Sequence, residues 1–267
     1  MVRVERAAPA IGAYVYGYQL DAGNLPAAAR QVRAWLTEHL VVVLRDQQLE
    51  AQTHRDLVAE LGPIFLHHTD EGVLFVDSFP EVLEMRKEPD GIRLFGGSDW
   101  HADVTFRNPA GYVSALHAKI LPAVGGDTGF ASGIAAYESL SPAFQSMLGR
   151  LTAVHCYNGP GQPDHPREIA EHPVIREHPV TAARGIYMNR MFVKRFVGMT
   201  EEESAPFISY LDQQMTRPEL TFRHRWAEGD LVFWDNRFTL HYPINDFTGA
   251  LRLLHRCTAM EGSGEHP

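Results

Sequence analysis

The last third of the chain alternates short apolar runs with turn signals. The runs are TFRHRW (221–226), LVFWDN (231–236) and LRLLHRCTAM (251–260), and EGD (228–230) and DFTG (246–249) are the turn signals between them. Short runs rich in β-branched and aromatic residues, bounded by glycine and aspartate, are typical of strands joined by tight turns. This part of the sequence therefore predicts an antiparallel β sheet.

Helical patterns come mainly before these strands. The helices expected from the spacing of apolar residues are 25–39, 49–62, two short helices within 132–151, and 200–215. Ser132 and Ser141 are the expected N-caps of the two short helices, and Thr200 with Glu203 fits a capping box. Short strands are expected at 40–45, 73–78 and 82–87. The pattern predicts a fold that is mainly β with flanking helices, a sandwich or jelly roll, in one domain spanning residues 1–267.

Residues 157–185 form the segment with the weakest pattern. The segment is rich in proline, glycine and histidine, and it is expected to be a long loop inserted in the domain. Long loops of this kind often lie over a binding site, so a lid is one interpretation. A plain surface loop is the alternative.

Charge and cysteine content exclude several classes of function. The net charge of −9 argues against a general surface for nucleic acid or anionic membrane. Two cysteines, Cys156 and Cys257, are too few for a disulfide framework and are expected to be free thiols. No run approaches the ~18–20 apolar residues of a membrane span, and the first residues lack the apolar core of a signal peptide. A cytoplasmic protein with no membrane partner is expected.

His101 and Asp103 stand two residues apart in SDWHADVTF (98–106). Their aromatic and β-branched neighbours favour a strand, in which such a pair shares one face. His241 follows an apolar strand and could complete a site with them. Two imidazoles and one carboxylate leave three positions free, which suits Fe(II) that also binds a co-substrate and O₂, whereas zinc prefers four ligands. On spacing alone, a polar pair that only stabilises the fold is also open.

Arg252 and Arg256 stand four residues apart in the last strand and would share one of its faces. An arginine in a pocket wall binds a carboxylate through two parallel hydrogen bonds, so this pair could hold two acidic ligands. The alternative, slightly favoured by spacing alone, is a pair of solvated charges on an outer strand.

The other histidines carry weaker signals. His172 and His178 lie in the proline-rich segment and are expected in surface or turn roles. His67 and His68 are adjacent, so in a strand only one of them can line a given pocket. His224, in RHRW, is expected on a charged strand face. The aromatic residues that could line a pocket, or simply belong to the core, are Trp234, Phe106 and Phe192.

Four segments together resemble the TauD/TfdA family of Fe(II)- and 2-oxoglutarate-dependent dioxygenases. They are WHADVTF, GGDTGFASGIAAYESLS, HPVIREHP and GDLVFWDNRFTLHYPINDFTGALRLLHRCT, and the resemblance runs with interruptions from about 41 to 260. It implies a double-stranded β-helix, which is a cupin-like jelly roll, with iron at one mouth. It also implies that His101, Asp103 and His241 bind Fe(II), and that Thr128 and Arg252 bind 2-oxoglutarate.

The same resemblance implies that Arg256 and His67 contact the substrate. Phe192, as a candidate wall of the pocket, is a further candidate for substrate binding. Asp70 stands where taurine-specific members have a tyrosine, and Gly97 stands where they have an asparagine, so taurine is not the expected substrate. Asp70 could bind an amine or face water. Dimers or tetramers would fit the family, so a homo-oligomer is expected.

The function expected is hydroxylation of a C–H bond in a small anionic substrate, with O₂ consumed and with succinate and CO₂ formed. Where the hydroxylated carbon bears a heteroatom, C–S or C–O cleavage would follow. Desaturation, or another oxidative step in natural-product biosynthesis, would use the same residues. A zinc hydrolase and a non-catalytic jelly-roll binding protein are the alternatives from other classes.

Overall fold

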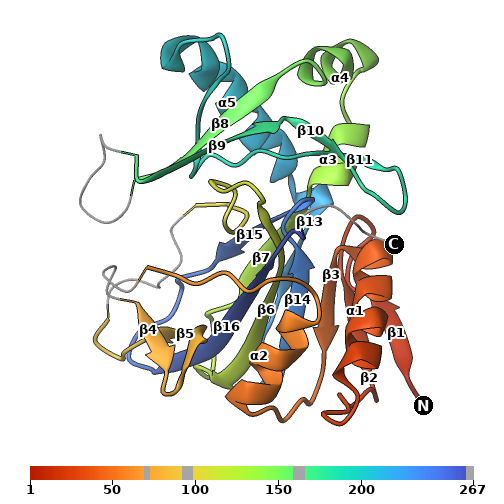
Figure 1. The fold of residues 1–267 in the computed structure, drawn as a ribbon, viewed down its shortest axis with the longest axis vertical. Helices are drawn as coiled ribbons and strands as arrows, with labels where there is room; N and C mark the ends of the chain where they lie inside the picture. Colours follow the sequence, from red (N-terminus) through yellow and green to blue (C-terminus); the bar gives the residue numbers. More distant parts are fainter. Residues whose placement is uncertain (69–72, 92–98, 159–165, 263–267) are drawn as a thin grey trace.

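The structure is a computed structural model that describes residues 1–68, 73–91, 99–158 and 166–262. Its larger sheet has, within these residues, eight strands in the order β1-β2-β3-β14-β6-β16-β5-β4 (Figure 1). Neighbouring strands are antiparallel except for β2 and β3. The strands are β1 Arg3–Arg6, β2 Ala13–Tyr16, β3 Val41–Leu44, β4 Leu74–Val76, β5 Phe79–Lys87, β6 Gly111–Ile120, β14 Leu231–Asp235 and β16 Arg252–Met260.

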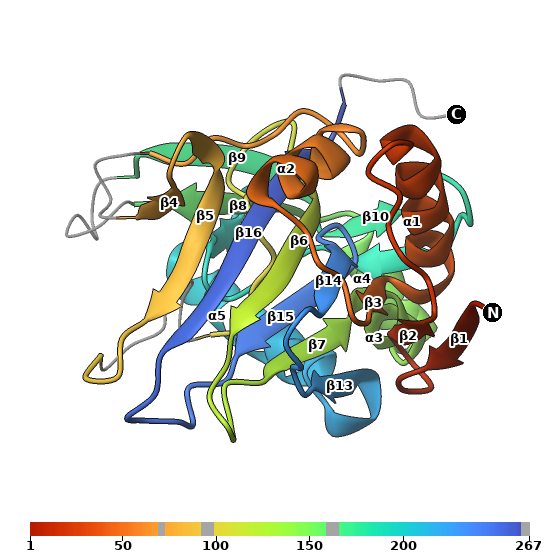
Figure 2. The same cartoon turned by 90° about the horizontal axis from the view of Figure 1, so that it is seen from below.

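A smaller antiparallel sheet faces the inner side of the larger one. Its order is β13-β7-β15, with bounds β7 Thr128–Ser132, β13 Thr221–His224 and β15 Thr239–Pro243. Figure 2 shows this sheet on one side of the larger sheet and helices α1 (Leu25–His39) and α2 (Ala51–Ala59) on the other. The two facing sheets form the predicted jelly roll.

Alternate side chains of strand β14 are buried on opposite faces of the larger sheet. Leu231 and Phe233 point to α1 and α2, while Val232 and Trp234 belong to the core between the two sheets. All four side chains are at most 1 % exposed. Burial of each large apolar side chain is worth about 1.5–3 kcal/mol, so this alternation fixes the register of the strand.

The described residues between β7 and β13, which are 133–158 and 166–220, form a further layer at the top of Figure 1. Its apolar core packs against the outer face of the smaller sheet through Ala131 and Leu240. The elements are α3 Gly133–Glu138, α4 Pro142–Leu148, β8 Thr152–Tyr157, β9 Glu168–Pro173, β10 Ile175–Glu177, β11 Arg184–Ile186, β12 Val193–Phe196, α5 Glu201–Met215 and a 3₁₀ helix Pro218–Leu220.

The predicted helices are confirmed, and α1 has the predicted bounds. Ser132 and Ser141 cap α3 and α4, and Thr200 and Glu203 form the predicted capping box of α5. Cys156 and Cys257 are free and buried, as expected. Among the described helices, none has both the length and the apolar character needed to cross a bilayer.

The segment 157–185 differs from the expected long loop. It contains β9, β10 and the first part of β11, and β9 pairs along its whole length with β8. Strand β9 alternates between buried and more exposed residues, with Ala170 and His172 buried, and this two-residue period stabilises a strand despite the prolines around it. Residues 159–165 lie outside the described part of the chain.

Candidate metal centre

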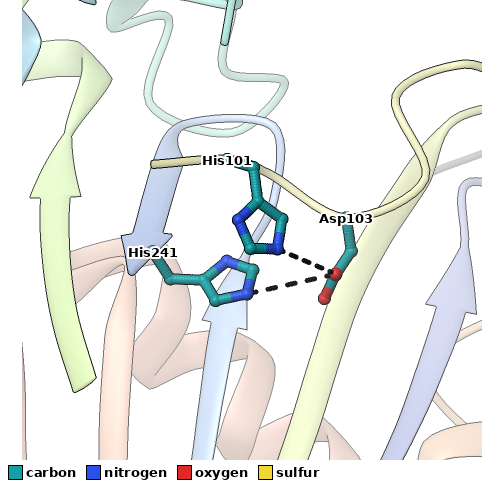
Figure 3. A group of neighbouring side chains, drawn as sticks. All are labelled: His101, Asp103 and His241. Atoms are coloured by element: carbon teal, nitrogen blue, oxygen red, sulfur yellow. Dashed lines mark ion pairs between the residues drawn. The ribbon is translucent and has the colours of Figure 1, made fainter. Parts of the chain in front are cut away.

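His101, Asp103 and His241 converge at one end of the space between the two sheets (Figure 3). One nitrogen from each histidine and one oxygen of Asp103 all lie within 4.8 Å of one another. Oδ1 of Asp103 is 3.9 Å from Nε2 of His101 and 4.0 Å from Nε2 of His241. The three side chains are buried, so their donor atoms face one another away from bulk water.

His101 and Asp103 do not lie in the predicted continuous strand but in a bridge followed by a turn. His101 pairs with His241 through a single antiparallel bridge, with hydrogen bonds of 3.0 and 2.7 Å. The chain then turns, and Val104 adopts a positive φ of 55°. Gly111 makes this turn possible, because a Cβ there would lie 2.5 Å from the carbonyl oxygen of Asp103. The expectation of a shared strand face was therefore wrong, although the two side chains do meet.

The protonation states of the two histidines suit a metal. Nδ1 of His101 lies 2.9 Å from the carbonyl oxygen of Asp99, so the ring donates its proton there and leaves Nε2 with a free lone pair. Burial lowers the pKa of His101, and burial followed by the neighbouring His101 lowers the pKa of His241. Both rings are therefore neutral at physiological pH, which is the form that binds a metal.

Asp103 is held as a carboxylate by several groups. Burial is the largest single influence and would raise its pKa, but Arg256, His241, His101 and Ser114 together outweigh burial, and the pKa lies well below its usual range. Ser114 donates a 2.6 Å hydrogen bond to Oδ2, the oxygen on the other side from the histidines. The carboxylate thus presents Oδ1 to the two imidazoles in a fixed orientation.

A hydrogen-bond network that sequence reasoning missed supports Asp103. Asn236 accepts from the backbone N–H of Asp103 at 2.9 Å and donates to Ser114 at 2.9 Å. Trp234 donates from Nε1 to the same oxygen of Asn236 at 2.9 Å. The WDN triplet that ends β14 was the available signal, but its partners lie more than a hundred residues away in sequence.

Arg256 lies next to the three ligand side chains. Its Nη1 donates to Oδ1 of Asp103 at 3.0 Å, and its Nη2 is 3.4 Å from Nε2 of His67. Burial lowers the pKa of His67 to about 3, and the charge of Arg256 adds to this shift, so His67 is neutral. Arg256 is therefore a buried cation beside the metal centre and not a solvated charge.

Aromatic side chains form one wall beside the ligands. The ring of Phe192 packs edge-on at 6.3 Å from the ring of His101, and Phe106 packs against Phe192 at 5.0 Å. Trp234 lies 4.8 Å from the ring of His241 on the core side. All three aromatic residues expected as candidate walls are thus close to the centre. Phe192 lies next to His101, Trp234 lies next to His241, and Phe106 packs against Phe192.

Arg252 shares the inner face of β16 with Arg256, as predicted from their spacing, and is 3 % exposed. Its Nε donates to the carbonyl oxygen of Gly126 at 3.1 Å. Burial lowers the pKa of Arg252 to about 10, and the nearby charge of Asp127 only partly opposes the shift. Within the described ranges no carboxylate forms an ion pair with Arg252, so its charge is available to an acidic ligand.

Thr128 is buried at the start of β7, two residues after Gly126. Gly126 allows a close approach between this segment and Arg252, because a Cβ on Gly126 would lie 3.1 Å from both Cδ and Nε of Arg252. The segment that leads into Thr128 therefore packs tightly against Arg252, the other residue predicted to bind 2-oxoglutarate.

Two further histidines considered from the sequence, His172 and His178, have structural partners. His178 accepts backbone N–H groups from Val180 and Thr181, which is the predicted turn role. His172 is buried, with Nε2 2.9 Å from the carbonyl oxygen of Arg107, so it is not a surface residue.

His224 is fully buried and lies 3.3 Å from both Asp230 and Tyr14, so the expected charged strand face was wrong. The alternation of TFRH predicted a strand, but these partners lie elsewhere in the sequence. Asp70 and Gly97 lie outside the described residues.

The donor set fits Fe(II) bound by two imidazoles and one carboxylate. Three buried donors from one side leave the other side of a metal open for further ligands, and the open side is where a dioxygenase needs them. Closed structural zinc sites are completed by a fourth protein ligand, and among the described residues no fourth histidine, cysteine or acid joins this group.

Comparison with known proteins gives consistent matches along almost the whole chain. The sequence pattern of the family described as "Taurine catabolism dioxygenase TauD, TfdA family" matches residues 3–258. An alkylsulfatase of Acinetobacter baylyi is 34% identical over 93% of this chain and 81% of that protein. An alpha-ketoglutarate-dependent sulfate ester dioxygenase of Pseudomonas putida is 32% identical over 96% of this chain and 88% of that protein.

The fold is also similar to solved structures. A crystal structure described as a putative alpha-ketoglutarate-dependent taurine dioxygenase from Burkholderia xenovorans superposes with a TM-score of 0.83. It is 31% identical, and the match covers 98% of this chain and 93% of that chain. The agreement therefore extends through both sheets and the layer between β7 and β13.

Proposed function

The chain belongs to the TauD, TfdA family, and from this premise we propose that it oxygenates the carbon that carries a sulfate ester. It is a 2-oxoglutarate-dependent dioxygenase with His101, Asp103 and His241 as its Fe(II) ligands. The family match therefore favours a dioxygenase over a zinc hydrolase or a non-catalytic binding protein. The proposal concerns the substrate and the residues that bind it.

The observation that carries the proposal is the buried cation Arg256 beside the metal ligands. Its guanidinium is 5 % exposed and lies within reach of the space next to Asp103. A desolvated guanidinium binds tetrahedral and planar oxyanions through paired hydrogen bonds. An anionic group held there would place the carbon next to it close to the iron. The relatives named for alkyl sulfates and sulfate esters favour a sulfate ester as that anion.

The neighbours of Arg256 suit the two ends of such a substrate. His67 is neutral and adds a polar contact for the sulfate without adding a second charge. Phe192 and Phe106 offer an apolar surface to the alkyl part and keep water from the reacting carbon. Desolvation by these rings also strengthens the attraction between the sulfate and Arg256.

Arg252 and Thr128 are proposed to bind the distal carboxylate of 2-oxoglutarate. Arg252 supports this role because it is a buried cation that forms no ion pair within the described residues. Thr128 adds a hydroxyl from β7 in the facing sheet. Together they would fix the far end of the co-substrate, so that its keto acid end meets the metal in one orientation.

Iron(II), 2-oxoglutarate and O₂ together supply the chemistry that replaces a C–H hydrogen with a hydroxyl group. A carbon that carries both a hydroxyl and a sulfate is unstable. The hydroxyl loses its proton, a C=O bond forms, and the C–O bond to sulfate breaks with its electron pair leaving on sulfate. Arg256 would stabilise the leaving sulfate. The products are an aldehyde, sulfate, succinate and CO₂.

The test is to supply the Fe(II)-loaded enzyme with 2-oxoglutarate, O₂ and matched candidate substrates. We expect alkyl sulfates such as hexyl sulfate to give succinate and free sulfate in equal amounts. Matched alkanesulfonates would release sulfite instead, and aryloxyacids would release a phenol. Turnover of sulfonates or aryloxyacids without turnover of sulfate esters contradicts the proposed substrate, while it leaves the dioxygenase class intact.

A further inference from the structure

Trp226 contacts Thr128, one of the two residues proposed to bind 2-oxoglutarate. It follows β13, whose last residue His224 is paired with Thr128 at the start of β7. The indole Nε1 of Trp226 donates to Oγ1 of Thr128 at 3.0 Å. Trp226 is 8 % exposed and Thr128 is 3 % exposed, so this hydrogen bond is shielded from water.

The position of Trp226 is fixed by groups that have no part in the metal centre. Asp230 accepts a hydrogen bond from the backbone N–H of Ala227 at 2.8 Å, which closes the turn directly after Trp226. Arg45 in turn donates to Asp230 at 2.5 Å. The ring of His224 packs edge-on against the indole at 4.6 Å. The indole is therefore in place before any ligand binds.

The chemistry of the two groups determines the direction of the hydrogen bond. An indole N–H can only donate, whereas a hydroxyl has one hydrogen and two lone pairs. Because Trp226 occupies a lone pair of Thr128, the hydroxyl hydrogen remains free to donate to another acceptor. Among the described residues, Trp226 is the one hydrogen-bond partner of this hydroxyl.

We infer that Trp226 is a positioning residue for 2-oxoglutarate, which holds the Thr128 hydroxyl so that its hydrogen donates to the distal carboxylate. This inference rests on the proposed co-substrate site. Trp226 would act on 2-oxoglutarate only through the Thr128 hydroxyl, whereas Arg252 would bind the distal carboxylate directly through its charge. A purely structural role would leave the indole hydrogen bond without effect on the ligand.

The experiment is calorimetric titration of 2-oxoglutarate into Mn(II)-loaded protein, which measures binding without turnover. Trp226→Phe keeps an aromatic ring and removes the donor. We expect this substitution to lower the affinity for 2-oxoglutarate by about 3- to 10-fold, which is the effect of one lost hydrogen bond. Pyruvate, which is a 2-oxo acid without the distal carboxylate, should bind equally to both proteins. Trp35→Phe, the same change in the core beneath α1, is the matched control and should alter neither affinity.

Two further variants make the result decisive. Thr128→Ala should lower the affinity for 2-oxoglutarate. Adding Trp226→Phe to Thr128→Ala should cause no further loss of affinity, because both substitutions act through the same Trp226–Thr128 hydrogen bond. Replacement of Trp226 by 3-benzothienylalanine, which exchanges N–H for sulfur in the same shape, gives the same test if the phenylalanine variant does not fold. In steady state, the KM for 2-oxoglutarate should rise while the KM for the substrate stays constant.

The possible failures are distinguishable. If Trp226→Phe leaves the affinity for 2-oxoglutarate unchanged while Thr128→Ala lowers it, the inference about Trp226 is wrong, but the proposed co-substrate site remains supported. Equal weakening of 2-oxoglutarate and pyruvate also overturns the inference, because it indicates a general disturbance. If Arg252→Ala and Thr128→Ala both leave 2-oxoglutarate unaffected, the proposed site fails and the inference fails with it.

Discussion

The guanidinium of Arg256 donates to Oδ1 of Asp103 at 3.0 Å, and this oxygen is the one that both metal-binding histidines face. A cation and the metal position therefore share one carboxylate oxygen. The arrangement places the proposed anion site next to the metal centre, since Arg256 has a fixed position relative to the iron ligands. A substrate anion bound to Arg256 is located with the same precision.

Replacement of Arg256 by alanine should weaken binding of the sulfate ester and leave binding of 2-oxoglutarate nearly unchanged. We expect the substrate KM to rise about 10- to 100-fold, because a charge-assisted hydrogen bond in a buried site is lost. Affinity for 2-oxoglutarate, measured by titration of the Mn(II)-loaded protein, should change by less than about 3-fold, below the effect of one typical hydrogen bond. Lysine at this position should restore part of the substrate affinity. Equal damage to both ligands would contradict the separate roles of Arg256 and Arg252.

A methyl group at Gly126 should disturb 2-oxoglutarate binding through Arg252. Gly126 has a φ of +72°, and its Cβ would lie 3.1 Å from Cδ and Nε of Arg252. Gly126→Ala therefore has to displace the guanidinium stem, and we expect the affinity for 2-oxoglutarate to fall on the order of tenfold, as for a lost charge-assisted bond.

Gly198→Ala is the control for backbone strain in that experiment. Gly198 has a similar φ of +82°, but nothing lies within 4 Å of its Cβ position. Both variants should lose about 1 kcal/mol of stability from the left-handed backbone, measured by urea unfolding. If Gly198→Ala weakens 2-oxoglutarate as much as Gly126→Ala does, contact with Arg252 is not the cause.

Local sequence predicted the helices and most of the late strands, because the signals for these elements lie within each segment. Helix α1 begins after Asn24, which caps it, and has the predicted bounds. The strand expected at 98–106 is instead a turn, because Gly111 allows the carbonyl of Asp103 to approach closely. That contact, like the burial of His224 against Tyr14 and Asp230, joins residues whose proximity no local pattern encodes.

The metal ligands were identified from sequence, but their support was not. His101, Asp103 and His241 follow from the family resemblance and from the chemistry of their side chains. Ser114 and Asn236 carry no comparable signal, because a serine within an apolar strand and an asparagine just after one have many possible roles. Their function appears only when the fold places β6 and β14 beside Asp103.

Ser114→Ala should weaken metal binding without removing a ligand. Ser114 donates to Oδ2 of Asp103 at 2.6 Å and so orients the carboxylate. Loss of a group that orients a metal ligand typically costs 10- to 100-fold in metal affinity, and we expect about tenfold here. Calorimetric titration of Mn(II) into the metal-free protein measures this. Ser146→Ala, an exposed serine on α4, is the control. Unchanged Mn(II) affinity in Ser114→Ala would contradict the orienting role of Ser114.

The last prediction concerns stability in acid and a cluster of histidines beneath α2. His54 lies on the buried face of α2 and is 1 % exposed. Its ring lies 6.2 Å from the ring of His117. Burial, followed by the neighbouring His117, lowers the pKa of His54 from 6.5 to about 3. Burial also lowers the pKa of His117 to about 4, with Lys119 next in effect.

These shifts make the folded state less stable as the pH falls. Below pH 6.5 the unfolded chain binds a proton at His54, whereas the folded protein does not bind it until about pH 3. Stability is therefore full above pH 6.5 and is lost progressively as the pH falls toward 3. For one such group the loss between pH 7 and pH 5 is about 2 kcal/mol. His54→Leu removes this group, so the difference between urea-unfolding free energies at pH 7 and pH 5 should shrink by that amount. An unchanged difference would mean that His54 is protonated in the folded protein at pH 5.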